Sequence, residues 1–517
     1  MNLHKYLLLL LCLGLLFACK KEIKNPPNPE PEEPTEQERL RASIYDYFNK
    51  YSLWTTNIPD LDENGRLDFV KKYSSNQSLL TALKNMTPFY QFRTYETLNI
   101  AVGNRYDRYS YLYEPQGGGN ASRAGGFRMD TNEGYGLHIF WGVVTEESVA
   151  WARPVVYFVE GGSPGHQAGV KRGAIVMEID NKQTRVPVFK GEDDEYYLSD
   201  QPLANTIFRA WYDGVEKPTL ALKLKLNGRE DVVTKLPLER AAEYEIKPII
   251  AHSVYTYSEK NIGYFAYSSF EQTDDGTHIG NTNKEEIDVV FQTFGTANIK
   301  DLILDLRYNT GGYVDAAVYL ANKIINRHGD GQLMFSYETN EYLARTQANS
   351  FKDVFFKKNN GTLELEKVFF LVTEQTASAA ELLISVLKPY MEIELVGDQP
   401  RTYGKPVGFF GEDVGDDVEL WAASFKTINN AKKEEDEKFR DYWDGLTVKG
   451  DNIAVDRISY DFGDREEDMI ARALVLAGIS PPSGLQASTR KNVSTQGGIK
   501  IGIINKPRER NLLKTKD

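Results

Sequence analysis

The stretch LILDLRYNTGG, residues 302–312, decides the fold prediction for this chain. Its first five residues form an apolar run broken by a single aspartate, which is typical of a strand buried in a parallel sheet. Similar runs stand at Ile262–Phe270 and Val368–Thr373, and helical patterns at about Glu285–Phe294 and Val314–Asn326 separate the three. This alternation of strands and helices predicts an α/β fold with a largely parallel sheet.

The composition excludes several classes of function. The chain has 517 residues, with 74 Asp and Glu against 61 Lys and Arg, so its formal net charge is −13. Such an acidic balance argues against a nucleic-acid groove, which requires a basic stripe. Two cysteines and six scattered histidines, without an HExxH pattern, provide neither a disulfide framework nor an obvious zinc site. We therefore expect no nucleic-acid partner, no metal and no organic cofactor.

The first residues are expected to be a targeting signal. The apolar run Tyr6–Phe17 is too short to span a bilayer as a helix, and it ends at Ala18-Cys19. This ending resembles the bacterial lipobox, whose cysteine is acylated. We expect a signal peptide at 1–18, a lipid anchor on Cys19 and a location outside the cytoplasm, in the periplasm or on the cell surface. The alternative is an ordinary secretory signal, and the sequence leaves the membrane and its face open.

The rest of the chain divides by composition into five further parts. A Pro- and Glu-rich tether is predicted at 19–38, since it cannot bury a core. Apolar spacing at Leu40, Ile44 and Phe48 predicts a helix, and the N-terminal part as a whole is expected to be helical. The predicted parts are a helical domain at 39–127, a β-rich domain at 128–240, the α/β domain at 241–480, and a tail at 481–517 with a strand at Gly498–Ile504.

Three segments of the α/β domain fit one mechanism: DLRYNTGG at 305–312, TEQTASAAE at 373–381 and GDQPRTYGK at 397–405. Ser378 follows an apolar strand and opens a helical pattern, which exposes its Oγ near helix N–H groups. The pair Gly311–Gly312 lets backbone N–H groups approach a substrate closely. Together with the Ala379 N–H, either glycine N–H is a candidate donor to a tetrahedral oxyanion.

A serine nucleophile needs a base, and Lys405 is the candidate. It must be neutral to act, so its pKa must fall from about 10.4 to about 7–8, which burial favours. A working Lys405 should therefore be shielded from water. The alternative is a histidine base, which requires His252, His278 or His328 to fold beside Ser378, and none of the three stands in a supporting motif.

In their order and content the three segments resemble the C-terminal processing peptidases, also called tail-specific proteases. The resemblance implies a crotonase-like α/β core and a serine endopeptidase with a Ser–Lys dyad. In this sequence Ser378 would be the nucleophile, Lys405 the general base, and Gly311, Gly312 and Ala379 the oxyanion hole. Glu381 matches the family's carboxylate three residues after the nucleophile, and its role is left open.

A second resemblance concerns the β-rich domain. GSPGHQAGVKRG at 162–173, followed by alternation at Ile175–Ile179, resembles a PDZ domain inserted into the chain. By this resemblance Tyr135, Gly136 and Leu137 form the loop that receives a peptide's terminal carboxylate, and the neighbouring strand edge accepts the peptide. Substrates would then be polypeptides with accessible C-termini. The alternative is a small β-domain that serves only as a spacer.

One departure from the family keeps another function open. Some members orient the lysine with a Gln four residues later, whereas this chain has Phe409. A non-proteolytic lipoprotein of the same fold, which binds a hydrophobic ligand or a peptide, is therefore the main alternative. A scaffolding lipoprotein that works through the PDZ-like domain is another. Asp305 and Arg307 are expected to form a structural ion pair that holds the glycine loop.

Overall fold

The computed structural model describes residues 33–88, 107–113, 131–480 and 510–512, apart from short internal gaps. The predicted signal peptide, Cys19, most of the tether and the strand expected at Gly498–Ile504 lie outside the described residues. The internal gaps are 147, 193–195, 226–232, 259, 274–277, 359–362, 416–417 and 431–441. Within the described ranges, no helix combines the length and apolar character needed to cross a bilayer.

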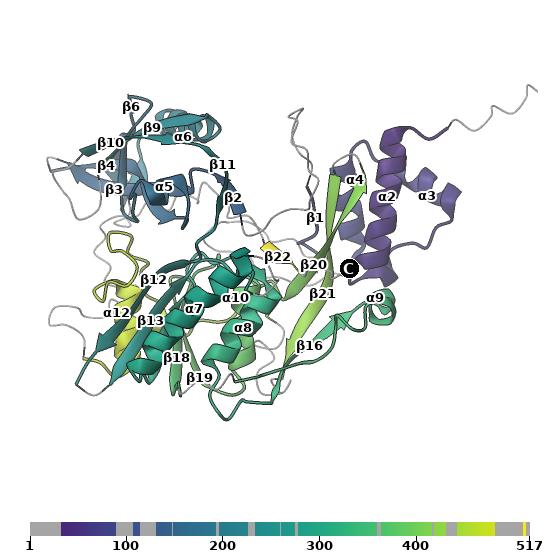
Figure 1. The fold of residues 1–517 in the computed structure, drawn as a ribbon. Helices are drawn as coiled ribbons and strands as arrows, with labels where there is room; N and C mark the ends of the chain where they lie inside the picture. The colour runs from purple at the N-terminus through teal and green to yellow at the C-terminus, as the bar shows by residue number, and fades with distance from the viewer. Residues whose placement is uncertain are drawn as a thin grey trace, which may run out of the picture.

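A five-stranded sheet forms the centre of the α/β domain (Figure 1). The strand β12 pairs antiparallel with β13, and the remaining neighbours pair in parallel. In spatial order the strands are β12 (Ile249–Thr256), β13 (Asn261–Tyr267), β14 (Asp301–Asp305), β18 (Lys367–Val372) and β19 (Glu392–Gly397). The predicted α/β class with a largely parallel sheet is confirmed.

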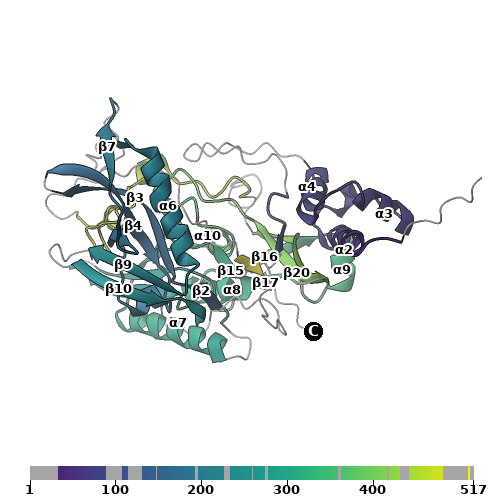
Figure 2. The same ribbon diagram turned by 90° about the horizontal axis from the view of Figure 1, so that it is seen from above.

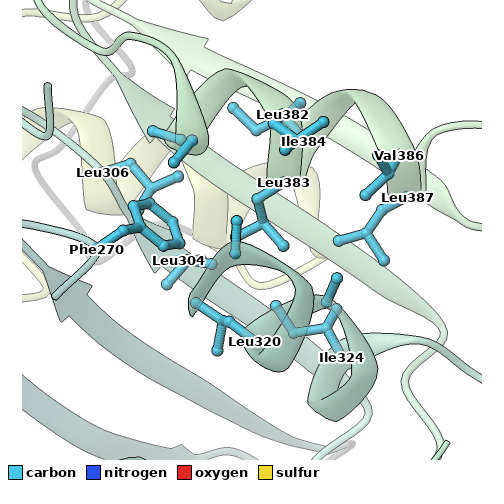
Figure 3. Packing of buried hydrophobic residues seen from close by; sticks show 14 of the residues in the cluster. Phe270, Leu304, Leu306, Leu320, Ile324, Leu382, Leu383, Ile384, Val386 and Leu387 are labelled. Atoms are coloured by element: carbon cyan, nitrogen blue, oxygen red, sulfur yellow. The ribbon is translucent and has the colours of Figure 1, made fainter. Parts of the chain in front are cut away.

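Helices cover both faces of this sheet. Leu302 and Leu304 of β14 pack on one side with α7 (His278–Thr296), α8 (Val314–Ile324) and α10 (Ala379–Leu387). Ile303 packs on the other side with α12 (Asp468–Leu476). Figure 3 shows Leu304 and Leu320 in the first of these clusters, close to residues of α10. Burial on both faces explains why β14 is almost continuously apolar in sequence.

A second sheet stands beside the first and carries the N-terminal helices (Figures 1 and 2). Its path is β15 (Gly311–Tyr313), β22 (Arg510–Leu512), β20 (Val407–Gly415), β21 (Val418–Asn429), β16 (Leu333–Thr339) and β17 (Val354–Phe355), and β1 (Tyr111–Tyr113) pairs with β21. The helices α2 (Glu36–Tyr51) and α4 (Asn76–Met86) share a hydrophobic cluster with Leu420 and Ala422 of β21. Three further helices contact α2: η1 (Thr55–Asn57), α3 (Glu63–Val70) and α9 (Glu341–Thr346). The short helix η2 (Gly450–Asn452) lies against β19 of the first sheet.

The helix predicted near residue 40 is present, and its buried face includes Leu40, Ile44 and Phe48. It begins at Glu36, inside the predicted tether, because Thr35 and Glu38 form a capping box. The last described part of the predicted helical domain is not helical. Residues 107–113 run onto the α/β domain, where β1 extends the second sheet.

Residues 131–245 form a separate β-rich unit. Its main sheet follows β10 (Val233–Glu239), β9 (Thr219–Lys225), β5 (Ile175–Ile179), β4 (Val149–Val159), β7 (Val186–Lys190) and β8 (Tyr196–Leu198). In addition β3 (Leu137–Glu146) pairs with β4, β6 (Lys182–Gln183) with β5, and β2 (Thr131–Gly134) with β11 (Ala241–Glu245). The unit also contains α5 (Pro164–Gln167) and α6 (Gln201–Val215), and its core includes Trp141 and Trp211.

One detail of this unit differs from the predicted alternation. Val176 and Ile179 of β5 are buried, rather than every second residue from Ile175. The pairing of β5 with β9 shifts register between Val176 and Glu178, and such a bulge reverses the faces of the residues beyond it. The PDZ assignment of this unit stays a prediction.

Candidate active site

Ser378 occupies the N-cap position of α10, at the carboxyl end of the parallel sheet, where the chain turns from β18. Its φ angle is +66°, a conformation that residues other than glycine rarely adopt. The side chain is only 5% exposed. A serine held in a strained turn between a strand and a helix is the arrangement expected of an activated nucleophile.

The Glu381 carboxylate connects the serine loop to the lysine turn. Its Oε2 accepts hydrogen bonds from the backbone N–H of Ser378 at 2.9 Å and of Lys405 at 2.8 Å. Its Oε1 accepts from the Gly404 N–H at 2.7 Å and from the Thr402 hydroxyl. Two segments that are separated in sequence therefore meet at one carboxylate, with Ser378 and Lys405 bonded to the same oxygen.

This carboxylate lies in a dry environment. Glu381 is 0% exposed, and burial raises its pKa above the usual 4.5, although the Thr402 hydroxyl and the three backbone N–H groups act to lower it. Dipoles rather than a cation satisfy its oxygens, so ionisation of Glu381 is less favourable than in water. The sequence left the role of Glu381 open, and in the structure it is a hub between two of the predicted motifs.

Lys405 lies just before β20, and its side chain is 1% exposed. This is the shielded environment that a lysine base requires. The Phe409 ring, which stands where a Gln was considered, lies with its centroid 4.6 Å from the Lys405 Nζ. An aromatic face at this distance attracts an ammonium group, so Phe409 contacts the lysine through its ring.

The glycine pair is also connected to the serine loop. The Gly311 N–H donates to the Asn309 Oδ1 at 2.9 Å, and the Asn309 carbonyl accepts from the Ala377 N–H at 3.0 Å. Gly312 has a φ of +145°, and a Cβ there would lie 2.1 Å from the Phe270 carbonyl oxygen. The Gly311 N–H is engaged within the turn, so the oxyanion prediction rests mainly on the N–H groups of Gly312 and Ala379.

The structure also bears on the histidine alternative. His252 and His328 are exposed, whereas Ser378 is buried. The side chain of His278 lies outside the described residues. Two of the three histidines considered as a base are therefore in surroundings unlike those of Ser378.

A buried ionic network joins the glycine loop to the β-rich unit. The predicted pair of Asp305 and Arg307 is confirmed, with both side chains buried and 2.6 Å between the charged groups. Arg307 also reaches Asp456 at 2.6 Å, and Asp456 pairs with Arg172 of the β-rich unit. Tyr308 donates to Asp456 and accepts from the Arg172 Nη1 at 2.8 Å. Although burial acts to raise the pKa of Asp456, the guanidinium groups of Arg172 and Arg307 hold it below 3.8.

The loop predicted to receive a carboxylate lies at the start of β3. Gly136 has a φ of +65°, and a Cβ there would lie 2.1 Å from the Ser163 Cβ, so the position requires glycine. Tyr135 is buried and its hydroxyl donates to the Lys217 carbonyl at 2.6 Å. Leu137 begins β3, which pairs with β4 alone among the described strands. The second edge of β3 is the place where the PDZ prediction puts a peptide.

Some residues of the site were not singled out from the sequence. Asn309 and Thr402 lie inside two of the quoted motifs, so the motifs could have been used to identify both residues. Arg108 and Tyr109 both donate to the Gly404 carbonyl, next to Lys405, from more than 290 positions away in the chain. No local pattern in the sequence indicated that contact.

Comparison with known proteins shows what the segment that carries the site is similar to. The model of peptidase family S41 matches residues 261–437, which include Gly311, Gly312, Ser378 and Lys405. Carboxy-terminal processing protease CtpA of Bacillus subtilis is 28% identical over 213 residues, which cover 40% of this chain and 41% of the relative. The chloroplastic carboxyl-terminal-processing peptidase 2 of Arabidopsis thaliana is 24% identical over 349 residues, covering 67% of this chain and 59% of the relative. The match therefore spans less than two thirds of either relative.

A solved structure supports the fold over most of the chain. The crystal structure of a predicted S41 protease from Bacteroides fragilis superimposes with a TM-score of 0.55. It covers 88% of this chain and 100% of the other, at 19% sequence identity. At this identity the likeness concerns the fold.

Proposed function

We propose that the chain is a serine endopeptidase of the C-terminal processing type, because residues 261–437 match the model of peptidase family S41. Ser378 is the nucleophile and Lys405 the general base. The N–H groups of Gly312 and Ala379 stabilise the oxyanion, with Gly311 shaping the turn. The observation that carries this proposal is the Glu381 carboxylate, which holds Ser378 and Lys405 together in a buried site.

The reaction proceeds in two halves. Ser378 Oγ attacks the scissile carbonyl carbon while its proton passes to the neutral Lys405 amine. The negative charge on the carbonyl oxygen is stabilised by the two backbone N–H donors. The C–N bond then breaks and the Lys405 ammonium gives its proton to the leaving amine, which leaves an acyl-enzyme. Water deprotonated by Lys405 hydrolyses this ester and regenerates the Ser378 hydroxyl.

Substrates are polypeptides that enter as extended strands. The strand β15, which contains the glycine pair, accepts β22 as a parallel neighbour, with Gly311 opposite Arg510 and Gly312 opposite Asn511. This pairing supports an added-strand mode of polypeptide binding at the oxyanion strand. The substrate's terminal carboxylate is held at Tyr135, Gly136 and Leu137, and its tail pairs with the second edge of β3.

The chain is further proposed to act outside the cytoplasm, anchored through lipid at Cys19. The argument is the lipobox-like ending of the first apolar run. Metabolic labelling with a fatty-acid analogue, in wild type and Cys19→Ser, tests this. Label in both variants, or in neither, would remove the anchor from the proposal.

Mass spectrometry of an unfolded protein with an apolar C-terminus, incubated with the purified enzyme, tests the activity. We expect cleavage by wild type and by Ser385→Ala, which changes another buried serine of α10. Ser378→Ala should lose activity by about 10³-fold or more. Cleavage by Ser378→Ala at the wild-type rate would mean that the nucleophile is assigned wrongly.

One observation favours the binding function as a second candidate. The Phe409 ring, 4.6 Å from the Lys405 Nζ, stabilises a protonated lysine, and a protonated lysine is not a base. If the substrate protein stays intact with folded wild type but its tail still binds, the chain is a peptide-binding protein of this fold. A Phe409→Gln variant that gains cleavage would show that the ring is what suppresses catalysis.

A further inference from the structure

The peptide unit that joins Gly404 to Lys405 is held at both ends. Its carbonyl oxygen accepts from the Arg108 Nη2 at 2.6 Å and from the Tyr109 hydroxyl. Its N–H donates to the Glu381 Oε2 at 2.8 Å. These bonds fix the plane from which the Lys405 side chain projects, since that plane ends at the lysine Cα.

The turn is also held by the Gly404 N–H, which donates to the Glu381 Oε1 at 2.7 Å, and by the Tyr403 N–H, which donates to the Thr376 carbonyl at 3.0 Å. Gly404 has no side chain, its φ is +88°, and a Cβ there would lie 2.3 Å from the Trp443 carbonyl oxygen. Glycine is the residue least restrained by its own sterics, so its orientation depends on the hydrogen bonds that it makes. Glu381 binds the N–H groups of Gly404 and Lys405, and Arg108 binds the Gly404 carbonyl. The Arg108 Nη2 also donates to the Trp443 carbonyl at 3.0 Å and so joins the turn to the segment at Trp443.

The segment that carries Arg108 is itself well anchored. The Asp107 carboxylate accepts from the backbone N–H groups of Tyr109 and Ser110 at 3.2 and 2.9 Å and from the Ser110 hydroxyl at 2.7 Å. The Ser110 Oγ also accepts from the Ala423 N–H of β21 at 2.9 Å. The segment then continues into β1, beside β21 and α4 (Figure 1). Arg108 therefore approaches the lysine turn from a rigid base.

We propose that Arg108, assisted by Tyr109, is a positioning residue for the Lys405 amine. This rests on the proposed function, in which Lys405 is the base. The Arg108 contact would orient the lysine in a chain that has Phe409 at the position where a Gln was considered. It also gives the N-terminal part of the chain a function, because Arg108 and Tyr109 lie outside the residues matched by the family model, 261–437. The S41 domain by itself lacks this support for its base.

Kinetics of the full chain test the proposal. Arg108→Ala should lower kcat by about 10- to 100-fold and leave KM within about twofold, because a misplaced base slows the chemical step and not substrate binding. Arg108→Lys, which keeps a donor and the charge, should recover part of the loss, and Tyr109→Phe should lose less than Arg108→Ala. The matched control is Arg185→Ala, which removes a guanidinium stacked at 4.7 Å on Trp151 of the β-rich unit.

A second measurement is independent of catalysis. Hydrogen exchange should show the amides of residues 404–405 exchanging at least about tenfold faster in Arg108→Ala than in wild type, with global unfolding unchanged. Unchanged exchange and unchanged kcat in Arg108→Ala would overturn the inference. A loss of kcat in Arg108→Ala that is accompanied by a loss in the free energy of global unfolding would also overturn the inference, because Arg108 would then be a structural residue. If wild type cleaves nothing, the proposed function fails, and faster exchange at 404–405 alone would still establish the positioning contact.

Discussion

Helices α2 and α10 begin with the same capping pattern, but the two capping carboxylates lie in opposite surroundings. In α2 the Glu38 carboxylate accepts from the Thr35 N–H at 2.8 Å, and in α10 the Glu381 carboxylate accepts from the Ser378 N–H at 2.9 Å. Thr35 has ordinary N-cap angles, whereas Ser378 has a φ of +66°. One cap lies at the protein surface, and the other lies at the candidate active site.

The difference between the two carboxylates is one of solvation. The hydrogen bond from the Thr35 backbone lowers the pKa of Glu38 below 4.5, while burial raises that of Glu381 above it. Glu381 also collects three further donors from the lysine turn, at Thr402, Gly404 and Lys405. Burial converts a local helix cap into a long-range connection, and it makes the ionised form of that cap less favourable.

Asp456 is a third carboxylate in this comparison: it is buried, as Glu381 is, but cations neutralise its charge. The largest effect on stability is expected from Asp456→Asn, which leaves Arg172 of the β-rich unit without its counter-ion in a site where both side chains are at most 10% exposed. We expect a loss of about 3–5 kcal/mol, measured by urea unfolding. Asp468→Asn is the control, because its partner Arg457 is 33% exposed. Equal losses in the two variants would mean that burial of the ionic network contributes little.

Glu381→Gln should give the next largest effect. A glutamine amide has one acceptor oxygen, and its NH₂ group would face N–H or O–H donors, so about 3 kcal/mol of stability should be lost. The proposed peptidase activity should fall with it, since the serine loop and the lysine turn lose their common anchor. Urea unfolding and peptide cleavage measure the two effects. Glu38→Gln, the same change at the equivalent position of α2, should cost clearly less and leave cleavage unchanged.

The strained backbone at Ser378 predicts a smaller effect. Ser378→Gly should be more stable than Ser378→Ala by about 1 kcal/mol, because glycine adopts a positive φ without steric cost. At Ser385, inside α10, the order should reverse, with Ala more stable than Gly. Thermal unfolding of the four variants measures this. The same order of stability at both positions would mean that the backbone at Ser378 is not strained.

The smallest effect is a difference in pH dependence. The folded pKa of Glu381 is raised, so its contribution to stability is present below pH 4.5 and is lost as the pH rises through the folded pKa. That of Glu38 is lowered, so its contribution is present above pH 4.5 and is lost as the pH falls through the folded pKa. The stability difference between wild type and each Gln variant, measured from about pH 4 to pH 7, should therefore slope in opposite directions. Parallel slopes would contradict the assigned environments.

Much of the core was predictable because its signals are local. The apolar runs of β13, β14 and β18 and the helical spacing in α2 indicated elements that the structure contains. The motifs around Gly311, Ser378 and Lys405 indicated three loops. These loops lie near one another in the structure, because each motif follows a parallel strand or adjoins the same edge of the sheet. The bulge in β5 was missed, because a register shift depends on the partner strand β9 and leaves no mark in β5 itself.

The sequence by itself determined which segments become strands and helices, because strand burial, helix spacing and capping are properties of neighbouring residues. It also indicated the residues to which the proposed chemistry is assigned. The tertiary structure alone decided that Glu381 is a hub while Glu38 is a surface cap. It also decided that Arg108 holds the carbonyl before Lys405. Both outcomes depend on which groups are brought together from distant positions and shielded from water, and no local pattern records that.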